Sequence, residues 1–362
     1  MRLAVKYSVA LAAVLSCAAL APASADPLKI GLLIPNAVAE VGWDHEIDRG
    51  GKDLVQKFGD QIQLNAVTNV LEGPDATRVM NKMAADGAKM VILGGFGQMN
   101  DGLRLAKKDP KLSVLHLGGY LNEPNFATLA IRHYEGSYLC GMAAGYATKS
   151  KQLGVVAAFP LPEVLNILNA WVLGAQSVNP DLKSVKVVWL NSWFDPTKEK
   201  SAAQSLVSQG SDVIYSLFPG TASTVAAAEQ LGAYVTVTLS DASKIAPTKH
   251  LCAAQASFGP GFIKKVQEVV DGKFAGDDTF LGVKDDSMRA AGLSKDLSEE
   301  QKKAIQAKQD EMKSGAFQPF KGPIEANDGS QAVAAEASLT DKQIRGMNFL
   351  VKGIDAKLPK RN

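Results

Sequence analysis

Histidine and cysteine, which often carry metal and nucleophilic chemistry, are scarce in this sequence of 362 residues, with four and three copies. It contains no Cys-x-x-Cys pair, no His-Glu-x-x-His string and no Gly-x-x-x-x-Gly-Lys phosphate loop. Two of the histidines, His116 and His133, lie in strand-like patterns, where a histidine is more often a satisfied core residue than a ligand. We therefore expect a protein that is not an enzyme and that holds no metal or cofactor.

The sequence also lacks an excess of either charge. It has 39 Lys and Arg residues against 37 Asp and Glu residues, and two of the basic residues, Arg2 and Lys6, lie in the first 25 positions. Without these two, 37 basic residues face 37 acidic ones. This balance argues against a nucleic acid or an anionic membrane as the main partner. The ligand need not be highly charged.

Long hydrophobic runs are limited to residues 9–21, a stretch too short to span a bilayer, because a membrane helix needs about 20 apolar residues. Basic residues precede this run and small residues follow it at 23–25, which is the pattern of a signal peptide. We expect export to the periplasm with cleavage after Ala25. The alternative is a lipoprotein acylated at Cys17, which would put the bulky Leu15 where small residues are usual.

Removal of residues 1–25 leaves two cysteines, Cys140 and Cys252, which lie 112 positions apart. An oxidising compartment would permit one bond between them, but one pair in a chain of this length is not a disulfide scaffold. We interpret both as small buried hydrophobic residues. The remaining length is enough for two domains of ordinary size.

Continuous apolar runs alternate with longer amphipathic stretches in two successive sets. The first set covers residues 28–35, 63–67, 90–94, 113–117 and 128–132, and the second covers 153–158, 186–191, 212–217, 234–239 and 250–256. Apolar runs without polar alternation are typical of parallel strands buried on both faces. We predict an α/β protein of two doubly wound parallel-sheet lobes with a ligand cleft between them.

The expected lobes alternate along the chain. Lobe 1 takes residues 26–133 and about 256–280, lobe 2 takes residues 134–255 and about 281–335, and residues 336–362 form a C-terminal tail packed on the lobes. In the less regular last part, residues 298–315 predict a charged surface helix with Ser298 as its N-cap and Gly315 as its end.

Aromatic residues gather at the predicted carboxyl ends of the strands, where parallel sheets bind ligands. The strand ends and the loops after them carry Trp43, Phe96, Phe159, Trp193 and Phe258. Asp241 follows the strand at 234–239, and His45 is the one histidine in such a loop. Singly, these residues have ordinary explanations in packing and turns. Together they favour a flat, mostly uncharged ring held by stacking, with a carboxylate accepting hydrogen bonds from its N–H or O–H groups.

Several ordered strings surround these positions. They are Gly42-Trp43, Phe96-Gly97, Gly118-Gly119-Tyr120, Tyr134-Glu135-Gly136, Phe159-Pro160 with Pro162-Glu163-Val164, and Asn191-Ser192-Trp193-Phe194-Asp195-Pro196. In these strings the chain resembles the basic membrane protein family of type I periplasmic binding proteins, which includes purine nucleoside and purine base receptors. The resemblance covers nearly the whole chain after residue 25.

The resemblance implies a receptor whose lobes close over a purine base or nucleoside and which then docks on the permease of an ATP-driven importer. By motif match, the ring-stacking or pocket-wall residues are Trp43, Phe96, Phe159 and Trp193. Asp241 is then the polar contact. We expect a monomer with no nucleic acid partner.

Two strings depart from the family pattern at the edge of the expected pocket. Phe218-Pro219-Gly220-Thr221 stands where relatives commonly have His-Thr-Asp-Ser, so ionisable groups are missing there. Phe258 followed by Gly261-Phe262 stands where relatives often have tryptophan and a tyrosine pair. Another heteroaromatic ligand is therefore an alternative to a purine. A sensor that presents its ligand to a membrane receptor is the alternative to a transporter component.

Overall fold

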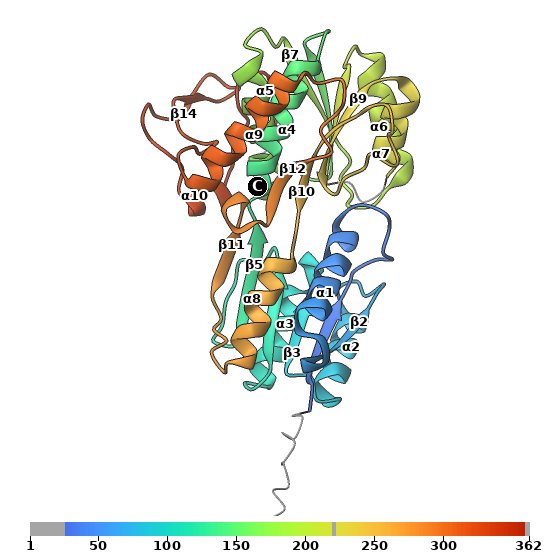
Figure 1. The fold of residues 1–362 in the computed structure, drawn as a ribbon, viewed down its shortest axis with the longest axis vertical. Coiled ribbons are helices and arrows are strands. Elements are labelled where there is room, and N and C mark those ends of the chain that lie inside the picture. Colours follow the sequence, from blue (N-terminus) through green and yellow to red (C-terminus); the bar gives the residue numbers. More distant parts are fainter. Residues whose placement is uncertain (1–25, 219–221, 359–362) are drawn as a thin grey trace, which may run out of the picture.

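The computed structural model describes residues 26–218 and 222–358, and these form two α/β lobes that lie end to end along the long axis of Figure 1. All ten strands expected from the sequence are present, and their ends differ from the predicted ones by at most two residues. The predicted fold class is confirmed. Among the described residues, no helix combines the length and the apolar character that a membrane crossing requires.

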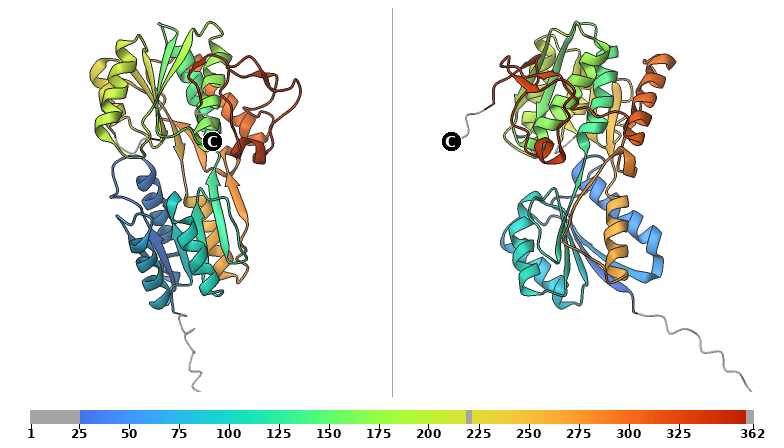
Figure 2. Two further views of the ribbon diagram at one scale, coloured as in Figure 1. Left: turned by 180° about the vertical axis from the view of Figure 1, so that it is seen from behind. Right: turned by 90° about the vertical axis from the view of Figure 1, so that its left-hand side faces the viewer.

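Lobe 1 is built on a six-stranded sheet in the order β11-β5-β4-β3-β1-β2, with every neighbouring pair parallel. Its strands are β1 (Leu28–Leu33), β2 (Ile62–Val67), β3 (Met90–Leu93), β4 (Ser113–Leu117), β5 (Phe126–Ile131) and β11 (Asp278–Leu281). Helices α1 (Trp43–Phe58) and α8 (Gly259–Val270) pack together on one face, and α2 (Pro74–Ala85) and α3 (Met99–Lys108) pack together on the other (Figure 2). The apolar strands are thus covered on both sides.

Lobe 2 contains a seven-stranded sheet in the order β12-β10-β9-β8-β6-β7-β15, in which β12 runs antiparallel to β10. Its strands are β6 (Gln152–Ala157), β7 (Ser184–Trp189), β8 (Val213–Leu217), β9 (Tyr234–Leu239), β10 (His250–Ala256), β12 (Met288–Ala291) and β15 (Ile354–Asp355). Its helices are α4 (His133–Ala147), α5 (Pro162–Val178), α6 (Pro196–Ser208), α7 (Ser223–Leu231) and α9 (Glu299–Ser314). Helices α4 and α5 pack against each other, as do α6 and α7.

Three chain segments join the lobes, because β5 leads into α4, β10 leads into α8, and β11 leads into β12. After α9, which has the predicted Ser298 cap and ends at Gly315, the chain forms a hairpin of β13 (Ile324–Glu325) and β14 (Gln331–Val333). The short helix α10 (Asp341–Arg345) follows, and β15 then adds to the edge of the lobe 2 sheet beside β7. The last part of the chain is therefore built into lobe 2.

Cys140 in α4 and Cys252 in β10 form a disulfide with an S–S distance of 2.05 Å. Both residues are fully buried, as expected for small hydrophobic side chains. The sequence left open whether they are bonded, because a spacing of 112 residues says nothing about distance in a folded lobe, and the structure has the bond. The bond fastens α4 to the sheet beneath it.

Candidate functional site

The carboxyl ends of the strands in the two lobes meet where the lobes touch. Gly42, which precedes α1 in lobe 1, donates its backbone N–H to Ser240 Oγ just after β9 in lobe 2, at 3.0 Å. Ring contacts cross the same boundary, since the centroids of Trp43 and Phe218 lie 6.2 Å apart. The loops that were expected to carry the site are therefore brought together.

Trp43 is the first residue of α1 and is held in a fixed orientation. Its indole Nε1 donates to the carbonyl oxygen of Gly94, at the end of β3, over 2.7 Å. Its ring meets Phe258 edge to face at 5.1 Å. Phe258 is only 1 % exposed and stacks in turn on Phe262, so it lies beneath Trp43 rather than at an open surface. Phe258 supports the ring that could face a ligand.

Lobe 2 contributes three neighbouring rings. Trp193, in the loop after β7, is 44 % exposed and lies 5.1 Å from Phe159, with an angle of 58° between the ring planes. Phe218, at the end of β8, lies 6.5 Å from Trp193 and also reaches Trp43. Rings from both lobes thus form one continuous series. Residues 219–221, the rest of the string that departs from the family pattern, lie outside the described residues.

Phe218 was not among the predicted site residues, because its string at the edge of the expected pocket stood out only for the ionisable groups it lacks. Its backbone has φ of 50°, which is unusual for a residue with a side chain, and its N–H donates to Thr238 Oγ1 at 2.8 Å. The positive φ is the kind of strained geometry that clusters at functional sites. A backbone conformation of this type cannot be predicted from the order of residues.

A second pair of rings lies on lobe 1. Phe96 is 48 % exposed and Tyr120 is 64 % exposed, and their centroids are 6.5 Å apart. They follow β3 and β4 respectively, so they also stand at carboxyl ends of strands. The buried side chain of Gln98 shapes the loop of Phe96, because it accepts from Gly95 N–H and donates to Val70. Large exposed rings in such loops have little packing reason to be there.

The two predicted polar residues make local contacts. Asp241 is exposed, accepts from the backbone N–H of Ser243 at 2.8 Å, and lies 3.5 Å from the ring of His250. Partial burial is the largest single effect and raises the pKa of Asp241, but the hydrogen bonds from Ser243 together with the charges of His250 and Arg289 outweigh it, so the pKa is lowered overall. His45 Nδ1 lies 3.0 Å from the carbonyl oxygen of Ala39. Asp241 thus stays within lobe 2. His45 lies in the first turn of α1, not in a loop as the sequence indicated, and contacts the loop before that helix.

A buried polar network that the sequence did not reveal ties the lobes together. Ser240 Oγ, which accepts from Gly42, also donates to Glu46 Oε1 at 2.7 Å, and Arg49 pairs with Glu46 Oε2 at 2.6 Å. Glu46 is fully buried, and this burial raises the pKa of its carboxyl to about 7 despite the opposing hydrogen bond from Ser240. A carboxyl group near its pKa at neutral pH therefore lies at the contact between lobes.

His133 also lies at this contact. It is the first residue of α4, not part of a strand as the sequence indicated, and its ring lies 5.1 Å from Phe218 and 6.4 Å from Trp43. Neither ring nitrogen has a hydrogen-bond partner among the described residues, and burial lowers the pKa of His133 to about 3, so it is neutral. His116, by contrast, has the expected core role, with Nε2 3.0 Å from the carbonyl oxygen of Gly95.

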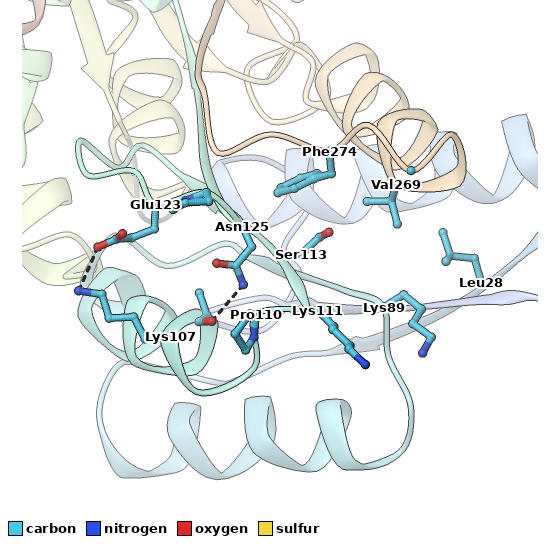
Figure 3. A pocket seen from close by; sticks show the side chains of 13 residues that line it. Leu28, Lys89, Lys107, Pro110, Lys111, Ser113, Glu123, Asn125, Val269 and Phe274 are labelled. Atoms are coloured by element: carbon cyan, nitrogen blue, oxygen red, sulfur yellow. Dashed lines mark hydrogen bonds and ion pairs between the residues drawn. The ribbon is translucent and has the colours of Figure 1, made fainter.

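One hollow among the described residues lies away from these rings. A depression of about 640 Å³ lies at the amino ends of the lobe 1 strands, lined by Leu28, Lys89, Lys107, Glu123 and Phe274 among others (Figure 3). Lys107 and Glu123 form an ion pair of 3.0 Å within it. It contains none of the rings described above. In the part of the chain that the structure describes, no group of three or more His, Cys, Asp or Glu side chains is placed to hold a metal ion.

Comparison with known proteins identifies the family and supports the fold. Residues 28–318 match the family model described as ABC transporter substrate-binding protein PnrA-like. A purine-binding protein of Brucella abortus is 36 % identical over 334 residues, which cover 92 % of this chain and 95 % of that one. A putative ABC transporter glucose-binding protein of Haloferax volcanii is 31 % identical over 193 residues, covering 53 % and 49 % of the two chains. An ABC transporter solute-binding protein of Conexibacter woesei superposes with a TM-score of 0.67 at 17 % identity, over 80 % of this chain and 98 % of that one.

Proposed function

The chain belongs to the family of PnrA-like ABC transporter substrate-binding proteins. We propose that it carries a purine base or nucleoside to its importer. Proteins of this class bind solute outside the cytoplasm and hand it to a membrane permease. The finer points, which are the ligand, its mode of binding and the residues that hold it, rest on the arrangement of side chains where the lobes meet.

The observation that carries the proposal is the set of aromatic side chains at the carboxyl ends of strands in both lobes. Three of them are well exposed, namely Phe96 at 48 %, Tyr120 at 64 % and Trp193 at 44 %. A flat heteroaromatic ring inserted between such side chains gains stacking of about 0.5 to 1.5 kcal/mol per ring pair beyond the area it buries. Lobe closure would place rings on both faces of the ligand.

Polar groups near these rings would form hydrogen bonds with the edge of the ligand. We propose Asp241 as an acceptor for ligand N–H groups, because it follows β9 where the lobes meet, with His45 in the first turn of α1 as a further contact. The lowered pKa of Asp241 keeps its carboxylate ionised at neutral pH, as an acceptor requires. Trp43, Phe159 and Phe258 would form or support the wall of the site.

A purine is favoured over a sugar because the purine-binding relative aligns along nearly the whole of both chains, whereas the glucose-binding relative aligns along about half. Aromatic rings also stack on sugars, so the two ligand classes must be compared directly. We further propose that residues 1–25, which lie outside the described residues, are a signal peptide cleaved after Ala25, and that the protein acts as a monomer. Mass spectrometry of the exported protein would detect an N-terminal Asp26.

Substitution of Trp193 tests the site. Trp193→Ala is expected to weaken purine binding at least tenfold, about 1.4 kcal/mol, because it removes an exposed ring without disturbing the core. Trp189→Phe is the matched control, since Trp189 lies in β7, only four positions away, and before the loop that faces lobe 1. Calorimetric titration of both variants with the best purine ligand gives the comparison. Equal affinity in wild type and Trp193→Ala would refute stacking on this ring.

A further inference from the structure

Two guanidinium groups flank one aromatic ring at the level where the lobes meet. The Arg132 guanidinium, at the end of β5, lies 4.2 Å from the centroid of Phe280 in β11, and that of Arg345, at the end of α10, lies 5.4 Å from it. Arg132 binds Asp341 in α10 through two hydrogen bonds of 2.5 and 2.7 Å. Arg345 pairs with Asp278 at the start of β11. Helix α10 is thus tied to lobe 1 at both of its ends.

The backbone of α10 nevertheless belongs to lobe 2. Asn166 in α5 donates to the carbonyl oxygen of Ile344 at 3.3 Å, and Ile344 itself is 4 % exposed. Met347, which follows the helix, is 1 % exposed and lies against Asn169 of the same α5. Arg345 is therefore carried by lobe 2, while its guanidinium binds lobe 1.

The lobe 1 partners of Arg345 include a loop of the proposed site. One guanidinium nitrogen donates to the carbonyl oxygen of Gly119 at 2.6 Å. Gly119 directly precedes Tyr120, the ring beside Phe96. The second partner, Asp278, is itself fixed by the hydroxyl of Thr128 at 2.8 Å. One side chain of lobe 2 thus holds the loop that presents an exposed ring of lobe 1.

We infer that Arg345 is a positioning residue for ligand binding, which fixes the Gly119–Tyr120 loop and favours the arrangement in which the lobes are together. The identity of the ligand in this inference rests on the proposed function. The link between the lobes rests on the contacts of Arg345 alone. The same structure has Gly42 and Ser240 in contact across the boundary, so the Arg345 contacts belong to an arrangement with touching lobes. We expect separation of the lobes to break these contacts, because Arg345 is packed on α5 of lobe 2 while its acceptors belong to lobe 1.

The strength of this link should depend on salt. The side chains of Arg345 and Asp278 are 23 % and 42 % exposed, so ions in solution screen their attraction. Glu163 at the start of α5 also lies near Arg345, but burial raises the pKa of its carboxyl to about 7, so it is only partly ionised at neutral pH. A guanidinium with two acceptors in fixed directions is not replaced fully by the single ammonium group of lysine. Arg345→Lys therefore keeps the charge but weakens the contacts, whereas Arg345→Gln removes the charge as well.

The first experiment needs no ligand. Spin labels at Val55→Cys in α1 and Leu231→Cys in α7 report the interlobe distance by double electron–electron resonance, since both positions are exposed. From residue 26 onward the native cysteines are paired with each other, so only the introduced ones react. Arg345→Gln should shift the distribution to longer distances, with Arg345→Lys between it and wild type. The control is Lys352→Gln, which removes a 2.8 Å ion pair to Glu325 inside the last part of the chain. Distributions identical in wild type and Arg345→Gln would overturn the inference.

The second experiment measures affinity, with adenine as the probe and an unfolding curve for each variant to show that the fold is retained. We expect Arg345→Gln to bind adenine about tenfold more weakly at low salt, about threefold more weakly at 0.5 M salt, and Lys352→Gln to bind as wild type. Adenine binding by wild type and Arg345→Gln with equal affinity would contradict the role of Arg345 in ligand binding. Absence of purine binding by wild type, with the distance shift present, would contradict the proposed ligand and still support the link between lobes.

Discussion

Helices α4 and α5 in lobe 2 pack with their backbones in contact, and Gly141→Ala should disrupt this packing. A Cβ at Gly141 would lie 2.0 Å from the carbonyl oxygen of Trp171, whereas ordinary contact begins near 3.4 Å, so the backbones must separate by about 1.4 Å. Gly174 in α5 meets α4 in the same way, at 2.0 Å from the oxygen of Tyr138. No side-chain rotation relieves a clash with backbone. The disulfide at Cys140 moreover prevents α4 from moving off the sheet.

The expected cost follows from two opposing effects. Overpacking against a fixed backbone costs about 3 kcal/mol, and replacing glycine by alanine inside a helix returns about 1 kcal/mol. We expect Gly141→Ala to lower the free energy of unfolding of lobe 2 by about 2 kcal/mol. Urea unfolding followed by tryptophan fluorescence suits this measurement, because Trp171 is buried beside the clash and stacks on Tyr215.

A matched control lies in the same helix. A Cβ at Gly136 would meet Met288 Sδ at 2.3 Å, the end of a flexible side chain that can turn away. Gly136→Ala should therefore cost less than Gly141→Ala. Removal of the disulfide by Cys140→Ala with Cys252→Ala should also reduce the penalty at Gly141, because α4 is then free to shift. Equal stability of Gly141→Ala and wild type would refute the close backbone packing of α4 and α5.

Three further predictions concern the contact between lobes and the disulfide. Ser240→Ala removes a hydroxyl that bridges Gly42 and Glu46 in a buried contact, and should lower the free energy of unfolding by about 1 to 3 kcal/mol in urea titration; Ser243→Ala, in an exposed turn, should have little effect. The pKa of Glu46 is raised to about 7, so its protonated form favours the folded state, and this contribution is full below pH 4.5 and is lost as the pH rises to 7. Glu46→Gln should reduce this loss of unfolding free energy by up to about 3 kcal/mol, as measured by unfolding curves from pH 4.5 to 8. An unchanged dependence of the unfolding free energy on pH would contradict the raised pKa. Replacement of both cysteines opens a loop of 112 residues and should cost up to about 4.7 kcal/mol of lobe stability, and a cost below about 1 kcal/mol would argue against the bond.

The strands could be predicted closely because a strand buried on both faces leaves a local record, a short continuous apolar run between turn residues. The Ser298 cap and the Gly315 end of α9 are equally local, since each depends on residues within one helical turn. Loops after such strands were also the right place to look for exposed rings. These features need no knowledge of distant contacts.

Features that depend on distant contacts could not be predicted. Glu46 and Ser240 are 194 positions apart, and nothing in either neighbourhood marks the pair. Phe258 and Trp193 look alike in sequence as rings after strands, yet one is 1 % exposed and the other 44 %, because the direction of the chain after the strand decides burial. The disulfide and the contacts of Arg345 could not be predicted for the same reason, because they join residues that only the tertiary structure brings together.

We expect the rings where the lobes meet to bind a purine. We would titrate the refolded, ligand-free protein with adenine, guanine, hypoxanthine, xanthine and their nucleosides, and in parallel with glucose, and follow tryptophan fluorescence. Trp193 is exposed and Trp43 lies at the same boundary, so a stacked ligand should quench them directly. We expect saturable quenching by a subset of the purines at micromolar or lower concentration and none by glucose. If no purine quenches the fluorescence and calorimetry detects no binding, these rings do not bind a purine.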